Sequence, residues 1–322
     1  MEYSILGRTG LKVSRAGFGG GGIGQVWGST TDQESIRAVR RALDLGINFF
    51  VVAPGYGDGK AEEVLGLALQ EHRDEAIVAT KVRLQANEMD DVAGAVARSV
   101  DASLARLKMD MVEVLHVHNR FTEHRGDTPD SLSADDALGP VLEAFQKLQK
   151  AGKTKFIGIS AMDPHVPSVV RIMESGQYDS VLAYYNLLNG TAQEPVPPTV
   201  DIFDNGQIIP LAKSLDMGVV GIRSHAAGAL STRVDRPIEG ATLLAQDVES
   251  TKTLDFLLDG PIHTMSQAAM VFCLMNRDIH TTVPGVKNVS EIEEIAGCVD
   301  LPPISSEHLE RLRELCKLGF RS

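Results

Sequence analysis

The stretch Phe49–Phe50–Val51–Val52–Ala53–Pro54–Gly55–Tyr56–Gly57 decides the fold. Phenylalanine and valine favour a buried extended segment, and we expect a strand from Ile47 to Ala53. Pro54 and Gly55 end it, because proline and glycine interrupt regular structure. Where strands alternate with helices, ligands bind just past the C-terminal ends of the strands. Tyr56 stands at that place and is the first candidate functional residue.

Composition and charge exclude several classes of function. The chain has 322 residues, of which 43% are hydrophobic and 23% charged, as is typical of a globular protein. No apolar run approaches the roughly 20 residues of a membrane span, and we expect no secretory signal. The net charge of −12 argues against nucleic acid or an anionic membrane as partner. The three cysteines lack metal spacing, which predicts free thiols, no metal and a cytoplasmic location.

Short apolar strands alternate with helical patterns along the whole chain. After a turn-rich hairpin at residues 1–12, the predicted strands are Val13–Phe18, Ile47–Ala53, Ala76–Lys81, Met111–His118, Lys155–Ser160, Ser180–Tyr185, Gly218–Ile222 and Ile279–Pro284. Strands this apolar are typical of a parallel sheet covered on both faces. Helix starts are marked by Thr31 with Glu34 and by Ser133 with Asp136, each a capping-box pattern. The predicted fold is α/β, a (β/α)8 TIM barrel with an N-terminal β-hairpin, in one domain over residues 1–322.

A glycine run after the first strand offers a competing interpretation. Gly19-x-Gly21-x-x-Gly24 matches the dinucleotide fingerprint of a Rossmann fold, which also needs an acidic residue ending the second strand. Val51-Val52-Ala53 stands there instead, so we prefer the barrel. In a barrel the same glycines, Gly20 among them, form the first strand-to-helix loop and let backbone approach a cofactor. A loop without ligand contacts is the alternative.

Three polar residues fall at the ends of consecutive strands: Tyr56, Lys81 and His118. In a barrel these ends converge on one mouth, so the side chains can meet. Hydride transfer to a carbonyl leaves an alkoxide that needs a proton, which a phenol can give. A nearby ammonium favours the phenolate form, and an imidazole can orient the carbonyl. Each residue alone also has a structural explanation. His116 points the same way as His118, and we prefer His118 because it lies nearer the mouth.

The chain resembles the aldo-keto reductases over nearly its whole length. The matching pieces are Leu6–Ser14, Tyr56-Gly57 with Glu62-Glu63, Ala79-Thr80-Lys81, His116–Asn119, Gly152-Lys153 before Ile157–Ser160, Tyr185–Leu188 and Pro284–Asn288. The resemblance implies an NAD(P)H-dependent oxidoreductase that reduces an aldehyde, ketone or sugar to an alcohol, or runs the reverse reaction. It gives Tyr56 the role of acid/base, Lys81 the role of tuning it and His118 the role of orienting the carbonyl.

Several family positions differ here. Val51 replaces an aspartate that pairs with the lysine in relatives. Lys81 then either stays charged and favours the phenolate more strongly, or becomes neutral on desolvation and tunes Tyr56 poorly. We therefore expect a weakened or altered reductase. The other departures are Ala161, Leu182 and Ile222 or Arg223, at positions of an asparagine, a glutamine and the aromatic that stacks on nicotinamide; they leave the carboxamide contact mainly to Ser160.

The resemblance also places the cofactor. The loop after strand seven would hold the pyrophosphate, and the loop after strand eight precedes a helix N-terminus, a natural anion site. Lys287 could meet a 2′-phosphate, so we favour NADP(H) over NAD(H), although Glu291 stands where relatives often have arginine or glutamine. Glu294 matches an adenine-binding acid or is a solvated helix residue. The expected cofactor-binding residues are Gly20, Ser160, Arg223, Gly228, Gly285, Lys287 and Glu294.

Two long polar loops, Asn119–Leu132 and Thr191–Gln207, favour a hydroxylated small-molecule carbonyl such as a sugar as substrate. Two other classes of function remain open. One is a cofactor-binding sensor or subunit with little catalysis, which Val51 favours. The other is a redox-neutral barrel epimerase or lyase that uses Tyr56 and His118.

Overall fold

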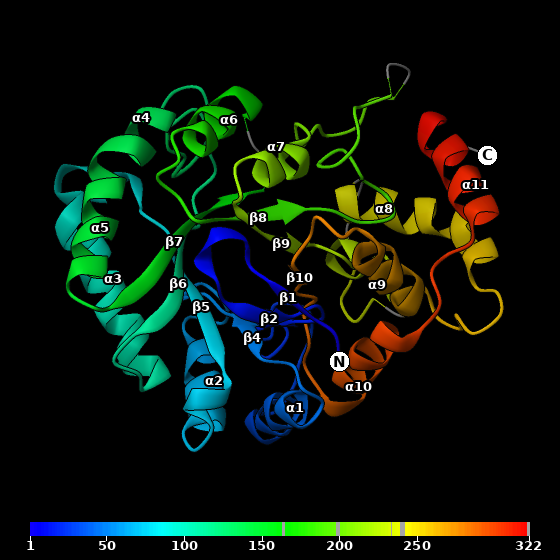
Figure 1. Ribbon diagram of the computed structural model, residues 1–322, viewed down its shortest axis with the longest axis horizontal. Coiled ribbons are helices and arrows are strands. Elements are labelled where there is room, and N and C mark those ends of the chain that lie inside the picture. The colour runs from blue at the N-terminus through cyan, green and yellow to red at the C-terminus, as the bar shows by residue number, and fades with distance from the viewer. Residues whose placement is uncertain (163–164, 198–199, 233, 239–241, 321–322) are drawn as a thin grey trace.

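The computed structural model describes residues 1–322 except 163–164, 198–199, 233, 239–241 and 321–322. Its main sheet has eight parallel strands in chain order: β3 (Phe18–Gly19), β4 (Phe49–Val51), β5 (Ile77–Val82), β6 (Val112–Val117), β7 (Thr154–Ala161), β8 (Ser180–Tyr184), β9 (Gly218–Ile222) and β10 (Thr281–Thr282). Parallel bridges from Ala16 to Thr282 and from Gly19 to Gly285 bring the two edges together. The sheet therefore curves into a nearly closed ring, and the predicted barrel is confirmed (Figure 1).

Helices lie outside this ring (Figure 1). They are α1 (Asp32–Asp44), α2 (Lys60–Leu69), α3 (Val92–Leu107), α4 (Ala134–Asp136), α5 (Leu142–Lys150), α6 (Val166–Glu174), α7 (Ile208–Ser214), α8 (Leu243–Thr251), α9 (Met265–Met275), α10 (Val289–Gly297) and α11 (Ser306–Lys317). Of these, α8 lies in a segment where no helix was predicted from sequence. Among the described residues, no helix has both the length and the apolar composition needed to cross a bilayer.

Each strand of the ring is buried on both faces. On β4, Phe49 and Val51 belong to a small apolar cluster inside the ring. Phe50 and the following Val52 belong to the larger cluster between strands and helices. This alternation follows from the two-residue period of a strand. It explains why the segment has an unbroken apolar sequence and why Val51 faces the interior.

The N-terminal hairpin closes one end of the ring. Its strands β1 (Tyr3–Ile5) and β2 (Lys12–Ser14) pair antiparallel, and in Figure 1 they lie across the middle of the barrel. Leu6 and Val13 pack into the interior cluster with residues of the ring strands. The hairpin therefore forms the floor, on the side away from the C-terminal strand ends.

The first ring strand was predicted at Val13–Phe18, and this prediction is wrong. Val13 belongs to the hairpin strand β2, and β3 begins only at Phe18. The chain changes direction between them, where the buried guanidinium of Arg15 donates to backbone carbonyls of the segment before β10, including that of Asn276. The apolar character of Val13 therefore comes from its place in the floor, which local sequence does not distinguish from a place in the ring.

A buried polar network supports β5 from outside. Glu62 of α2 is fully buried and accepts a hydrogen bond from the Thr80 hydroxyl at 2.6 Å. Its second oxygen accepts from Arg106 Nε of α3 at 2.8 Å. Two helices and a strand are thus tied together directly behind Lys81, the residue after Thr80.

We predict that Glu62→Ala lowers the free energy of unfolding by about 2 kcal/mol, because it leaves the fully buried Thr80 hydroxyl and the partly buried Arg106 guanidinium without their partner. Urea denaturation measures the change. The matched control is Glu63→Ala on the same helix, whose carboxylate is 51% exposed and pairs with Lys60 at 3.7 Å. That change should stay within about 0.5 kcal/mol. Equal effects of the two substitutions would contradict the structural role of Glu62.

Candidate active site

A pocket of about 1170 Å³ lies at the C-terminal ends of the ring strands. The lining residues at or just past these ends are Gly19, Val51, Lys81, His118, Ser160, Leu182, Ile222 and Val283. Every strand of the ring therefore contributes to one mouth. Further lining residues come from the loops after β9 and β10.

Tyr56, Lys81 and His118 come together in this pocket. Lys81 is 2% exposed, and its Nζ donates to the Val52 carbonyl at 2.8 Å and to the Tyr56 hydroxyl at 3.2 Å. The His118 ring meets the Tyr56 ring edge to face, with centroids 6.0 Å apart. The three side chains that sequence reasoning placed at successive strand ends thus form one polar cluster.

The turn that presents Tyr56 depends on close glycine contacts. Tyr56 N–H donates to the Ala53 carbonyl at 3.1 Å, so the chain turns immediately after β4. Gly57 follows with a φ of +64°, which glycine adopts readily. A side chain there would collide with the carbonyl of Gly24, in the loop after β3. The glycine loop and the tyrosine turn therefore pack backbone to backbone.

The two histidines of β6 have different surroundings. His116 is fully buried inside the ring, with Nε2 3.0 Å from the Ser180 hydroxyl. His118 lies two residues nearer the mouth and lines the pocket. Burial, and then the charges of Lys81 and Arg83, lowers the pKa of His118 to about 3. Its imidazole is therefore neutral at physiological pH, and a neutral imidazole can donate one N–H to a carbonyl oxygen.

Val51, at the aspartate position, is 3% exposed and packs with apolar interior residues such as Leu182 and Val283. The contact that the ammonium of Lys81 makes at this strand is with the carbonyl of Val52, the next residue. The neighbour of the ammonium at this position is therefore a backbone dipole and an apolar side chain, where the sequence resemblance implied a carboxylate.

Strained backbone marks the loop after β9. Arg223, Ala226 and Ala227 have φ values of +60°, +44° and +56°, in a region that side chains other than glycine rarely adopt. Asn186 Nδ2 donates to the Arg223 carbonyl at 2.8 Å and holds the start of the loop. Arg223 and Gly228 both line the pocket, as the expected cofactor loop requires.

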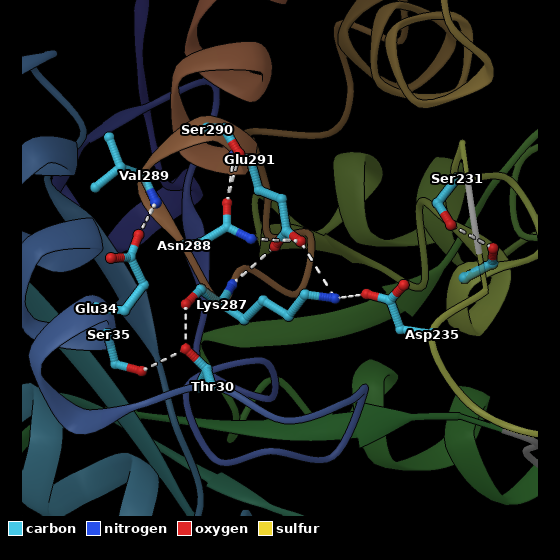
Figure 2. Close-up of polar contacts among 11 residues, drawn as sticks. Thr30, Glu34, Ser35, Ser231, Asp235, Lys287, Asn288, Val289, Ser290 and Glu291 are labelled. Carbon is cyan, nitrogen blue, oxygen red and sulfur yellow. Dashed lines mark hydrogen bonds and ion pairs between the residues drawn. The ribbon is translucent and has the colours of Figure 1, made fainter.

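The loop after β10 is fixed by a polar network, which Figure 2 shows. Lys287 forms an ion pair with Asp235 and lies 3.4 Å from a Glu291 oxygen. Asn288 caps α10 by accepting from Glu291 N–H at 2.9 Å. Lys287 is thus placed in the pocket wall, but two carboxylates already accompany its charge.

Some of the other expected cofactor residues line the pocket, and one does not. Ser160, Gly285 and Glu294 line the pocket, and Glu294 accepts from the Thr264 hydroxyl at 2.5 Å. Gly20 does not line it, because its N–H donates to the Val51 carbonyl at 2.8 Å. Its neighbours in the glycine run that do line the pocket are Gly19, Gly21 and Gly22.

The two loops expected to contact substrate differ in their relation to the pocket. Arg120, Thr128 and Pro129 of the first loop line the pocket. In the second loop, Thr191–Gln207, positions 198–199 lie outside the described residues, and none of the described residues lines the pocket.

Sequence reasoning gave no role to Arg236, His225 or Ser266, which line the pocket. The guanidinium of Arg236 lies 5.1 Å from the ring centroid of Trp27, and that of Arg223 lies 5.5 Å from it. His225 bridges the hydroxyls of Ser224 and Ser266 at 3.0 and 3.1 Å. The capping box Thr264-Met265-Ser266-Gln267 was a readable signal for the helix start that carries Ser266.

Comparison with known proteins places this site in a family. Residues 15–317 match the model of the Aldo/keto reductase family. An L-galactose dehydrogenase of Arabidopsis thaliana is 31% identical over 323 residues, which cover 98% of this chain and 93% of that protein.

Solved structures agree in fold. An aldo-keto reductase from Bacillus halodurans in its holo form superposes with a TM-score of 0.73 at 23% identity, over 98% of this chain and 96% of that one. An aldo/keto reductase from Klebsiella pneumoniae in complex with NADP and acetate gives a TM-score of 0.72 at 19% identity, with the same coverage.

The burial of His116 predicts a loss of stability in acid. Burial, and then Lys81, lowers the pKa of His116 to about 3. The unfolded chain binds a proton there below about pH 6.5, while the folded protein does not. Stability is therefore lost as the pH falls from that value toward 3, and by pH 5 this residue accounts for about 2 kcal/mol.

Urea denaturation of wild type and His116→Gln at pH 7 and pH 5 measures this contribution. The loss of stability between the two pH values should be about 2 kcal/mol smaller in the variant. His72→Gln, at a side chain that is 38% exposed, is the control and should keep the wild-type loss. An identical loss in wild type and His116→Gln would contradict the assignment.

Proposed function

The chain belongs to the aldo/keto reductase family, and from that premise we propose that it transfers hydride between a nicotinamide cofactor and a small carbonyl compound. Carbonyl reduction to an alcohol, or the reverse oxidation, is the reaction. The observation that carries the proposal is the 3.2 Å contact between Lys81 Nζ and the Tyr56 hydroxyl at the pocket mouth. It joins a proton donor to a cation where a carbonyl oxygen can reach both.

The pocket has the size and lining that a dinucleotide needs. Its volume of about 1170 Å³ exceeds the roughly 300–1,000 Å³ of ordinary small-ligand pockets. Gly228 and Gly285 leave backbone accessible, while Arg223 and Arg236 supply charge-assisted donors for phosphate. Ser160 is placed to hold the carboxamide. When bound, the reduced nicotinamide supplies the hydride.

The chain's own residues handle the proton. Tyr56 gives its phenolic proton to the developing alkoxide, and Lys81 stabilises the phenolate that remains. His118, neutral because of its lowered pKa, donates an N–H to the carbonyl oxygen and orients it. The Val52 carbonyl fixes the ammonium at 2.8 Å and so keeps it beside the phenol.

We further propose NADP(H) rather than NAD(H). Lys287, Arg223 and Arg236 give the end of the pocket formed by the loops after β9 and β10 three cations, which favour an additional phosphate. Asp235 and Glu291 compete for Lys287, so the selectivity depends on the two arginines as well. A hydroxylated, sugar-like substrate agrees with the polar loop Asn119–Leu132 and with the Arabidopsis relative, which is named for a sugar.

A cofactor-binding sensor or subunit with little catalysis is the second candidate, and Val51 is the observation that favours it. NADPH consumption with a panel of aldehydes and sugars separates the two. The sensor binds cofactor, seen as a change in cofactor fluorescence, but leaves the panel unreduced.

Tyr56→Phe should lower kcat by at least about 100-fold, because general acid catalysis by a positioned side chain contributes about 10²–10⁴-fold. Cofactor binding should persist, since the ring and its packing remain. Steady-state rates of NADPH oxidation and a fluorescence titration measure the two quantities. The matched control, Tyr3→Phe, changes an exposed hairpin phenol and should keep wild-type kcat. Wild-type turnover in Tyr56→Phe would remove the phenol from the mechanism.

Val51→Asp should raise kcat, because a carboxylate beside β5 would give the Lys81 ammonium a counter-charge that helps to hold it beside the Tyr56 phenol. Val51→Asn has nearly the same shape without the charge and should not reproduce the gain. The measurement is kcat for the best substrate of the panel. A rate equal to or below that of wild type in the aspartate variant would show that the Val52 carbonyl alone suffices.

A further inference from the structure

The carboxylates that line the pocket are confined to one part of it. Of the described residues that line it, the carboxylates are Asp235, Glu291 and Glu294, all in segments after β9. The lining residues that come from the first six strands of the ring and their loops include Lys81, Arg83 and Arg120 but no carboxylate. The part of the mouth that surrounds Tyr56 and His118 is therefore basic, in a chain whose net charge is −12.

Strand geometry places Arg83 above the reacting groups. Arg83 follows Lys81 by two residues at the end of β5, so the two side chains point to the same side. Arg120 follows His118 beyond a bend at Asn119 and lines the same pocket. The β5–β6 register pairs Lys81 with His116. Continuing that register by two residues brings Arg83 opposite His118, and the charge of Arg83 contributes to the lowered pKa of His118. The Arg83 Cα thus lies roughly 7 Å farther out along the strand than the Lys81 Cα.

Buried hydrogen bonds fix the backbone that carries these arginines. Asn119 is 2% exposed, and its Nδ2 donates to the carbonyls of Leu84 and Asp130, each at 2.7 Å. Its Oδ1 accepts from Leu84 N–H at 3.0 Å. This buried amide joins the loop after β5 to the loop after β6, and so fixes the spacing between Arg83 and Arg120.

One ion pair orients the Arg83 side chain and leaves other guanidinium donors available. Its Nη2 lies 3.4 Å from Asp130 Oδ2, while Asp130 Oδ1 accepts from Ala86 N–H at 3.2 Å. A guanidinium has five N–H donors, so one contact of this kind leaves a pair of N–H groups that can bind a second anion. The Arg83 side chain is 55% exposed, which a ligand arriving from solvent requires.

We propose that the carbonyl substrate carries an anionic group, a carboxylate or a phosphate, which Arg83 and Arg120 bind while the carbonyl carbon lies beside Tyr56 and His118. This inference rests on the proposed carbonyl chemistry and adds the substrate class to it. Planar guanidiniums bind both anions through paired N–H donors. A neutral sugar can accept hydrogen bonds from the arginines but has no charge to pair with theirs. The spacing fits a substrate in which about four or five bonds separate the carbonyl carbon from the anionic centre.

Two matched aldehyde pairs test the inference and distinguish the anions: D-erythrose 4-phosphate against D-erythrose, and 5-oxopentanoate against pentanal. For each pair the readout is the ratio of kcat/KM values, anionic over neutral, from NADPH oxidation by the full-length protein. We expect a ratio of about ten or more for at least one pair, since hydrogen bonds to charged groups contribute about 1.5–3 kcal/mol. The pair with the larger ratio identifies the anion, and the ratio should fall at about 0.5 M salt.

Arg83→Gln and Arg120→Gln should each lower the ratio about tenfold. Arg83→Lys, which keeps the charge without the paired N–H groups, should retain more of the ratio than Arg83→Gln and guards against a folding defect. The matched control is Arg98→Gln, which removes the same charge from a side chain that is 67% exposed on α3 and does not line the pocket. It should leave the ratio unchanged.

The outcomes separate this inference from the proposed function. If the wild-type protein reduces the neutral aldehydes but shows a ratio near one for both pairs, or if the arginine variants keep the wild-type ratio, the anionic substrate class is refuted while the reductase stands. If none of the four aldehydes and none of the wider panel is reduced, the proposed function itself fails.

Discussion

The buried ammonium of Lys81 is the interaction on which the rest of the site depends. It is 2% exposed and held by the Val52 carbonyl at 2.8 Å and the Tyr56 hydroxyl at 3.2 Å. A buried charge is tolerated only when its donors are paired, so both partners have to stay in place. One partner is backbone just past the end of β4, and the other follows it after a tight turn. The proposed chemistry therefore depends on the register of two neighbouring strands.

The surrounding structure holds that register from three sides. Leu6 and Val13 of the hairpin fill the floor of the ring. Outside, Glu62 ties α2 to Thr80 and so fixes the strand position immediately before Lys81. At the mouth, the backbone of Gly24 packs against the Tyr56 turn. Because the interior below is filled with apolar side chains, the polar residues at the strand ends lie at the mouth, where a substrate can reach them.

Sequence predicted the features that local pattern controls. The ring and the meeting of Tyr56, Lys81 and His118 follow from apolar runs that end in turns. Helix α8 was not found this way, because none of its residues is fully buried, Leu243 is 62% exposed, and only the pair Leu244 and Val248 packs against the core. Glu34 shows a second limit: Thr31 caps α1 as expected, but the Glu34 carboxylate accepts from Val289 N–H at 3.1 Å. That contact joins segments 255 residues apart, which no local signal reports.

The apolar residue at position 51 and the arginines at the mouth both make the electrostatic potential of the site more positive. Valine stands in place of a carboxylate, and the partners described for the Lys81 ammonium are dipoles, the Val52 carbonyl and the Tyr56 hydroxyl. Arg83 adds a second positive charge at the end of the same strand. A protonated His118 would face both cations, which together with burial accounts for its neutral state. In the reaction that we propose, this field stabilises the Tyr56 phenolate, the developing alkoxide and an anionic group on the substrate. A substrate with its own negative charge therefore supplies part of the counter-charge that the chain lacks at Val51. The valine at this position and an anionic substrate would thus compensate each other electrostatically.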